Sequence, residues 1–422
     1  EPVRRQTLGV PLVLEQLMRI ATDAAGLSGA RADQLRRAMG AKRSLERMEA
    51  LKGELMAGME EHGIDTLTRE RIFDQLKAFA DFGFPESHSF SFAHIVYASA
   101  WLKVHAPEHF YAAILSSQPM GFYSPATLVQ DARRHGVTVL GPSVNDSFLD
   151  TGVQCAPGVP GEQEYREGRP DPLPSRQVIP LDMDEELVVR IGLSSVRGLG
   201  RAAERIVRVR ETGAFSSQAD LANRAHLSAS DMECLAMAGA LECLGVGRRE
   251  GTWAAGALAA PTARQGEWQP FLPGTEVGTH VPDLPPLTHT EQMRADIETT
   301  GLTPGKHPFS YLRGDLSPGV LRAAELGAHL DGRIVDVAGL VTHRQRPHTG
   351  GGVTFLSLED ESGFVNVSVA VGTWNKFRHI GLEPGALLVR GTLEWGDGAV
   401  NVRAFRLAPV RLPIQVRSRD FR

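Results

Sequence analysis

The hydrophobic residues of this chain change their spacing between its two ends, and this change most limits the folds open to it. Near the amino end, Leu14, Leu17, Met18 and Ala21 recur at three- and four-residue intervals, which is the period of an amphipathic helix. Between 333 and 405, apolar and polar residues alternate, which is the period of a half-buried strand. We therefore expect separate helical and β-rich domains, and 422 residues suffice for roughly two to four of them.

The helical period extends through residues 10–136. Pro107 suits the start of a helix and Gly136 suits the end of one. A short strand is expected at 137–140. Beyond the first helix, we expect helices near 31–38, 43–61, 66–80, 88–104, 107–117 and 124–135.

The alternating segments of the carboxyl part have the order of a known barrel. They lie at 333–341, 353–359, 364–370, 386–393 and 399–405. A short helix is expected near 372–380, between the third and fourth segments. Five strands with a helix at that point predict an OB-fold β-barrel.

A Gly-x-Gly turn at Gly198 and Gly200 lies between these two parts. A β-rich run at 187–193 precedes it, and a helix is expected at 201–211. Two further short helices are expected near 217–224 and 228–240. The turn resembles the centre of a helix-hairpin-helix, whose backbone N–H groups bind a DNA phosphate without reading sequence. An ordinary loop before a helix is the alternative.

The charge of the chain is unevenly distributed. The formal net charge is −5, but basic residues cluster at 31–52, 197–210 and 403–422. Because salt limits each field to about 10 Å, such clusters can follow phosphates even in an acidic chain. Solvated helix faces remain the alternative for each cluster.

Several classes of protein are disfavoured by composition. Three irregularly spaced cysteines predict neither a disulfide framework nor a zinc site, which fits a reducing cytoplasm. No apolar run reaches about 18 residues, so no membrane span is expected. The segment 300–307 is one residue short of a P-loop and has His307 where Ser or Thr would bind magnesium. The opening Glu-Pro-Val-Arg-Arg has no signal-peptide pattern, and we expect a piece of a longer protein.

One run of sequence resembles a known family. Phe-Gly-Phe-Pro-Glu-Ser-His at 82–88 leads into an aromatic-rich helix that ends Trp-Leu-Lys-Val-His-Ala-Pro at 101–107. This run resembles the fingers region of bacterial C-family DNA polymerases, the alpha subunits of DNA polymerase III. The segments at 117–124 and 129–136 are similar to the error-prone, damage-inducible members.

The resemblance implies an α+β multidomain fold and the carboxyl-terminal part of an error-prone translesion polymerase. The implied order is a helical fingers region at 1–146, a linker at 147–185, a helix-hairpin-helix domain at 186–245, a linker with little regular structure at 246–329, an OB-fold domain at 330–412 and a basic tail at 413–422. The palm domain would precede residue 1.

The resemblance also implies nucleotide contacts. The segment Leu-Arg-Arg-Ala-Met-Gly-Ala-Lys-Arg at 35–43 is similar to a fingers segment near the incoming triphosphate, and arginine forks suit phosphate oxygens. His88 lies at a helix start, where anions are attracted. The expected nucleotide-binding residues are Arg36, Arg37, Lys42, Arg43 and His88. A salt-bridged helix face is the alternative for the arginines.

DNA contacts are expected at the end of the aromatic helix, at the Gly-x-Gly turn and on the barrel. The candidates are Lys103, Arg197, Gly198, Gly200, Arg201, Arg205, Arg344, Arg346, Phe355 and Lys376, with His343 and Trp374 beside them. Phe355 could instead fill the barrel. Tyr97 and Trp101 share one helix face and are expected in a core, with stacking on a base as the alternative.

No catalytic residue and no metal ligand is expected in this chain. Polymerase chemistry needs paired carboxylates holding two Mg²⁺ ions, and the resemblance places them on the palm. Asp182 and Asp184 have the Asp-x-Asp pattern of such a pair, but we expect a loop there.

The implied partners are DNA primer–template, single-stranded DNA, deoxynucleoside triphosphates, accessory mutagenesis proteins and, indirectly, the sliding clamp, with no membrane. The alternatives are a non-catalytic DNA-binding or scaffold protein of DNA repair, the replicative alpha subunit itself, or a synthetase-like RNA binder.

Overall fold

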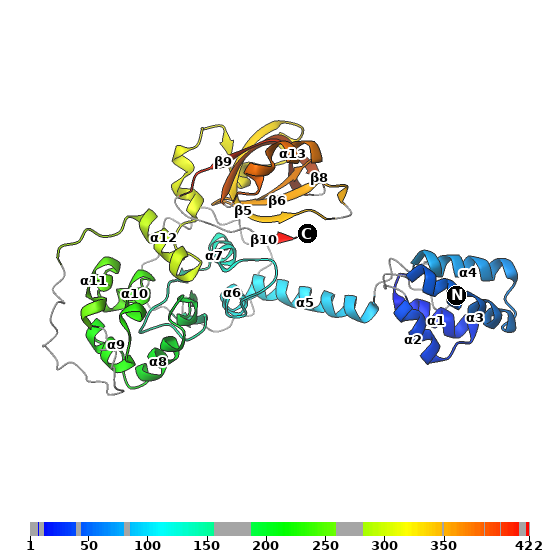
Figure 1. Ribbon diagram of the computed structural model, residues 1–422, viewed down its shortest axis with the longest axis horizontal. Coiled ribbons are helices and arrows are strands. Elements are labelled where there is room, and N and C mark those ends of the chain that lie inside the picture. The colour runs from blue at the N-terminus through cyan, green and yellow to red at the C-terminus, as the bar shows by residue number, and fades with distance from the viewer. Residues whose placement is uncertain are drawn as a thin grey trace. The chain divides into compact units, whose positions relative to one another are not determined.

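The computed structural model describes residues 7, 12–38, 44–79, 85–155, 187–258, 282–347, 350–383, 385–396, 398–412 and 419–421. The chain divides into two compact units, Glu1–Trp101 and Leu102–Arg422. Figure 1 shows the first four helices of the first unit in blue and the barrel of the second unit in colours from yellow-orange to red-brown. Among the described helices, none has both the length and the apolarity that crossing a membrane requires.

The first unit contains four packed helices, α1 (Leu14–Ala25), α2 (Gly29–Ala38), α3 (Ser44–Glu61) and α4 (Thr66–Phe79). Their apolar faces meet in one core, which includes Leu17, Leu35, Leu55, Met59, Phe73 and Leu76. Gly58 lets α1 and α3 approach closely, because a Cβ there would lie 2.0 Å from the carbonyl oxygen of Ala25.

Helix α5 (Glu86–His105) is long and apolar, yet none of its residues is buried. Tyr97 is 73% exposed and Trp101 is 43% exposed. The expectation that these two rings lie in a core is therefore wrong for this chain. Their spacing places them on one helix face, but spacing alone does not provide an element to pack against that face.

The second unit begins with α6 (Pro107–Ser116), α7 (Pro125–Arg134) and a small sheet. Strand β3 (Leu187–Arg190) pairs in parallel with β1 (Val139–Leu140) and antiparallel with β2 (Gly152–Cys155). One core joins these elements and includes Tyr111, Val129, Val139, Val189 and Leu302. The domain boundary expected after 146 therefore lies within a continuous folded region.

Four helices follow the small sheet: α8 (Arg201–Arg210), α9 (Gln218–Ala225), α10 (Ala229–Met237) and α11 (Arg248–Leu258). They enclose a core that includes Ile206, Leu221, Met232, Leu235 and Ala255. Ser217 and Ser228 accept hydrogen bonds from backbone N–H groups at the starts of α9 and α10, as N-caps do. The helices expected near 201–211, 217–224 and 228–240 are thus present.

The linker expected at 246–329 is wrong in part, because the region contains α11 and α12 (His289–Thr300). Its many small residues suggested irregular chain, but alanine favours helix and small side chains permit close packing. A Cβ at Gly251 would lie 2.9 Å from that of Ala236, so α10 and α11 pack tightly.

The carboxyl part is a closed five-stranded barrel. Its strands are β5 (Ile334–Gln345), β6 (Thr354–Glu359), β7 (Phe364–Val369), β8 (Ala386–Gly396) and β9 (Ala399–Val410). They pair in the order β5-β6-β7-β9-β8, and β8 closes back onto β5. The short strands β4 (Val320–Leu321) and β10 (Arg419–Phe421) pair in parallel with β5.

Helix α13 (Val371–Gly381) follows β7, as expected for an OB-fold. Its Trp374 is 5% exposed and packs in the barrel core with Val337, Leu356, Val367 and Val389. The predicted α+β fold with an OB-type barrel is confirmed, and Trp374 is a core residue.

Candidate nucleic-acid interface

The two arginines expected to bind phosphate lie at the exposed end of α2. Nε of Arg36 is 2.9 Å and Nε of Arg37 is 2.8 Å from the carboxylate of Asp33. The hydrogen bond from Arg36 is the main cause that lowers the pKa of Asp33. Exposed ion pairs of this kind are weak, so the arginines remain available to a phosphate. Lys42 and Arg43 lie outside the described residues.

His88 and Lys103 lie at opposite ends of α5. The exposed His88 ring meets the Phe92 ring edge-on at 4.5 Å. Nζ of Lys103 is 2.7 Å from the carboxylate of Asp131, which also accepts a 2.7 Å hydrogen bond from the hydroxyl of Tyr111. Burial alone would raise the pKa of Asp131, but the bonds from Lys103 and Tyr111 hold it below its usual value. Lys103 is thus an ion-pair partner rather than an unpaired surface cation.

The Gly-x-Gly turn has backbone φ angles that favour glycine over residues with a Cβ. Gly198 has φ 85° and Gly200 has φ 49°, and a Cβ at Gly198 would lie 3.2 Å from Sγ of Cys234. Leu199, between them, is 2% exposed and anchors the turn in the helical core. The turn therefore leads directly into α8 with both glycines at the surface.

The arginines of 197–210 do not form one continuous basic face. The guanidinium of Arg197 donates to the carbonyls of Ile297 and Glu298, at the end of α12. Arg205 donates to the carbonyl of Ala225 at 3.1 Å. Arg210 donates to the carbonyls of Val144 and Ser147 at 2.8 and 2.7 Å. Arg201 and Arg208 are exposed; of these two, Arg201 is an expected DNA contact.

The outer face of the barrel presents two rows of side chains. Strand pairing places Gln345, Phe355, Ser368 and Arg403 in one row and His343, Ser357, Asn366 and Asn401 in the next. Phe355 is 41% exposed, so it does not fill the barrel. Aromatic and amide side chains on this part of an OB-fold are typical of single-strand binding.

A groove of about 400 Å³ crosses this face. Its floor comes from β5, β6 and β7, through His343, Gln345, Phe355, Ser357, Phe364 and Asn366. Its wall comes from outside the barrel, through Phe122 and Tyr123 of the segment before α7. Sequence reasoning found His343 and Phe355 but missed the other rings, because nothing in the local spacing indicates that 122–123 meets the barrel.

Arg344 corrects the expected set of barrel contacts. Its side chain is 8% exposed, lies 3.3 Å from the carboxylate of Asp420 and donates to the carbonyl of Glu383 at 2.6 Å. A register shift between Val341 and His343 interrupts the alternation of β5, so Arg344 points inward. It is not a surface cation. Arg346 and Lys376 are exposed, and neither lines the groove.

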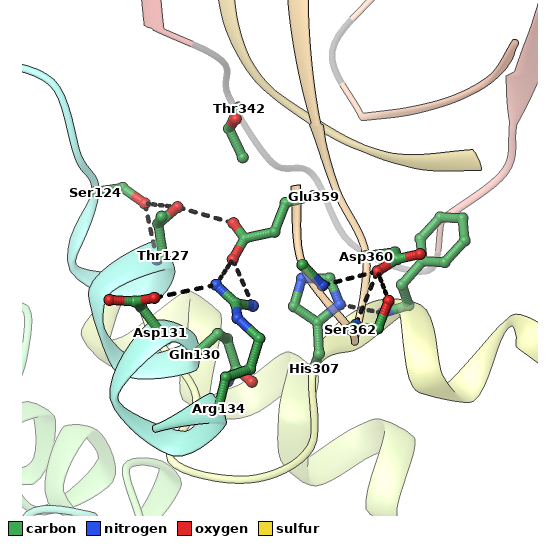
Figure 2. A network of polar contacts seen from close by, with 12 residues as sticks. Ser124, Thr127, Gln130, Asp131, Arg134, His307, Thr342, Glu359, Asp360 and Ser362 are labelled. Atoms are coloured by element: carbon green, nitrogen blue, oxygen red, sulfur yellow. Dashed lines mark hydrogen bonds and ion pairs between the residues drawn. The ribbon is translucent and has the colours of Figure 1, made fainter. Parts of the chain in front are cut away.

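A buried polar network joins α7 to the barrel (Figure 2). Arg134 donates two 3.1 Å hydrogen bonds to the carboxylate of Glu359, and the hydroxyl of Thr127 donates a third at 3.0 Å. Burial raises the pKa of Glu359 to about 7, although Arg134 and Thr127 act to lower it. The network fixes α7, and with it the segment that precedes α7, against β6.

A second network lies beside the first in Figure 2. Asp360 accepts hydrogen bonds from the backbone and side chain of Ser362 and from Arg313. Nearby His307 is buried, and burial lowers its pKa to about 3. Its neutral Nδ1 accepts the N–H of Phe309 at 3.1 Å. These contacts hold the segment before β4 against the barrel.

A larger hollow of about 1010 Å³ shares Phe122 and His343 with the groove on the barrel face. Arg197, Arg294 and Glu359 also border it. Among the described residues, no group of three or more His, Cys, Asp or Glu side chains is placed to hold a metal ion. Asp182 and Asp184 lie outside those residues.

Two family models match the chain. Residues 1–63 match the bacterial DNA polymerase III alpha subunit finger domain. Residues 136–251 match the helix-hairpin-helix motif.

Curated relatives match over the whole chain. The error-prone DNA polymerase of Mycobacterium tuberculosis H37Rv is 47% identical over 100% of this chain and 36% of its own length. That of Nocardia farcinica is 46% identical over 99% of this chain and 34% of its own length, and that of Cutibacterium acnes is 43% identical over 100% and 38%. The chain thus spans about a third of the length of these relatives.

Among solved structures, asparaginyl-tRNA synthetase from Pyrococcus horikoshii complexed with asparaginyl-adenylate is 24% identical, over 23% of this chain and 24% of that chain. The TM-score is 0.20.

Proposed function

We infer that this chain, as a member of the bacterial C-family DNA polymerases, supplies the DNA and nucleotide contacts of a translesion polymerase. The family premise rests on its similarity to the error-prone members. In this proposal the chain is the carboxyl-terminal part of the enzyme. The parent enzyme performs DNA-directed nucleotidyl transfer during damage-induced synthesis.

The aromatic groove on the barrel is the observation that carries the DNA-binding part of the proposal. An outward-facing surface with Phe355, Phe364 and amide side chains offers both ring faces and hydrogen-bonding edges to unpaired bases. The Gly198–Gly200 turn adds a candidate contact to a duplex phosphate. Together they would hold template on two surfaces of the same unit.

Nucleotide binding is assigned to Arg36 and Arg37, with Lys42, Arg43 and His88 as further candidates. Both α2 arginines are exposed and held in place by the single carboxylate of Asp33. A triphosphate carries more negative charge and more acceptor oxygens than one carboxylate, so it would compete well with Asp33 for these guanidinium groups. Deoxynucleoside triphosphates are therefore the proposed small-molecule partners.

Divalent metal chemistry is not assigned to this chain. The described residues offer no carboxylate cluster that fits Mg²⁺, and we place its ligands on the palm, upstream in the parent enzyme. The proposed macromolecular partners are primer–template DNA, accessory mutagenesis proteins and, through them, the sliding clamp, all in the cytoplasm.

A primer-extension assay tests whether this chain binds DNA without performing nucleotidyl transfer. With Mg²⁺ or Mn²⁺ and all four nucleotides, the purified 422-residue chain should bind primer–template without extending it. Adding the upstream part of a close relative in trans is the positive arm. Templated incorporation by the chain alone would contradict the proposal.

A further inference from the structure

Four aromatic side chains line the groove on the barrel face, and two of them do not belong to the barrel. Phe122 and Tyr123 are 62% and 48% exposed, while Phe355 and Phe364 on the floor are 41% and 39% exposed. Each ring therefore lines the groove and still presents part of its surface to solvent. Rings that only completed a core would be covered.

The wall of the groove is fixed to the floor. The ring Nε2 of His343 hydrogen-bonds with the carbonyl oxygen of Phe122, and the rings of His343 and Tyr123 meet edge-on at 5.8 Å. Ser124 then caps α7 by accepting the N–H of Thr127 at 3.2 Å. Since α7 is joined to Glu359 of β6, the wall is attached at both ends and is preorganised.

The polar groups of the groove suit a nucleobase. Gln345 and Asn366 each offer an amide donor and acceptor, and Ser357 offers a hydroxyl. Within the part of the chain that the structure describes, no carboxylate lines this groove. The guanidinium of Arg134 lies 5.3 Å from the centre of the Phe364 ring and is paired with the buried carboxylate of Glu359. An anionic strand with exposed bases therefore meets no carboxylate among the described side chains that line the groove.

We propose that Phe122 and Tyr123 stack on bases of single-stranded DNA and, with Phe355 and Phe364, form a composite site that the barrel alone does not contain. This inference rests on the proposed function, because it requires a single strand on the barrel face. It adds that the helical part of the same unit contributes half of the stacking surface. The single-stranded DNA binds between the wall and the floor of the groove.

Binding of fluorescein-labelled oligo(dT) to the purified chain, measured by anisotropy, tests the composite site. Phe122→Leu and Tyr123→Leu keep apolar bulk but remove the ring face, and Phe355→Leu is the reference for the floor. Each should weaken binding about five- to a hundredfold, the range for one lost base stack. Trp253→Leu, which removes an even larger ring that is 57% exposed on α11, should leave the affinity unchanged.

An abasic oligonucleotide with the same number of phosphates separates stacking from charge. It should bind wild type and both wall variants equally, and melting temperatures should show that the variants stay folded. If only Phe355→Leu weakens oligo(dT) binding, the composite site is overturned and the barrel function stands. Tighter oligo(dT) binding by the wall variants than by wild type would mean that the wall covers the site, and it also overturns the composite site. Tighter binding of wild type to RNA than to DNA of matched sequence overturns it as well. If wild type binds no oligonucleotide, the proposed function itself fails.

Discussion

Arginines that look alike in the sequence differ in what their guanidinium groups contact. Arg197, Arg205 and Arg210 donate to backbone carbonyls of their own unit. Within the described residues, Arg36 and Arg37 both pair with the half-buried carboxylate of Asp33. The first group stabilises the fold, and the second is available to a ligand.

Replacing Arg36 or Arg37 by alanine in the full-length parent should lower the efficiency of nucleotide incorporation about tenfold to a hundredfold. Each charge-assisted phosphate contact contributes roughly 1.5–3 kcal/mol, and it matters most as charge develops at the transferring phosphoryl group. Primer–template affinity should stay nearly constant. Single-nucleotide incorporation kinetics measure both quantities.

Arg31→Ala is the matched control, because Arg31 is also an exposed, ion-paired arginine of α2 but pairs with Glu54 of α3. It should leave incorporation unchanged. If all three variants only lower the melting temperature, the α2 arginines are a salt-bridged face and not a phosphate site.

Glu359→Gln should change how stability depends on pH. The folded pKa of Glu359 is about 7, above its ordinary 4.5, so the folded state retains a proton that the unfolded state has lost between these values. The protonated Glu359 therefore contributes fully to the free energy of unfolding below about pH 4.5, and this contribution is lost as pH rises through 7. Relative to the glutamine variant, wild type should therefore lose about 1–3 kcal/mol of stability from pH 4.5 to 8.

Thermal unfolding of both proteins across that range measures the difference. His307 has the opposite effect, because its lowered pKa removes stability as pH falls, but it is present in both proteins and cancels. Arg134 and Asp131 also face Glu359 and are likewise common to both. Parallel pH profiles would show that Glu359 does not titrate in this window.

At the scale of single elements, periodicity predicts most helices and strands because each buries one face. The helices of the first unit and the five barrel strands follow the expected ranges closely. Helix α11 was missed because small residues carry little hydrophobic pattern, and α12 was missed because most of its residues are polar, with only Met293, Ala295 and Ile297 apolar. The inward turn of Arg344 was missed because a bulge in β5 depends on strand pairing, which local alternation cannot show.

Gly198→Ala should destabilise the turn before α8. Its φ of 85° is unfavourable for a residue with a Cβ, and the added atom would approach Sγ of Cys234 at 3.2 Å. A loss of about 1–2 kcal/mol is expected, with weaker binding to duplex DNA. Denaturant unfolding monitored by circular dichroism measures the first effect.

Gly256→Ala is the control within the same unit, because Gly256 lies in α11 and an added Cβ there meets nothing within 4 Å. It should stabilise the chain by about 0.5–1 kcal/mol. Equal and small effects at both positions would mean that the Gly198 turn tolerates side chains and is not conformationally constrained.

At the scale of the whole molecule, sites form where segments far apart in the sequence meet. Thr127 and Glu359 are 232 positions apart yet share a hydrogen bond of 3.0 Å. The groove wall at 122–123 depends on that packing, so no local pattern predicts it. The sequence does predict the type of each domain, because helical and alternating periods are local properties, and its motifs indicate the family that it resembles.

Affinity of the chain for DNA as a function of salt tests the central claim most directly. The claim is that an acidic chain, with net charge −5, binds DNA through local cation clusters and aromatic rings. The logarithm of the association constant for oligo(dT) should fall linearly with the logarithm of salt concentration, with a slope of roughly −0.7 per phosphate contact. Oligonucleotides of mixed sequence should give nearly the same line. A flat salt response, or no measurable binding at 50 mM salt, would contradict the account.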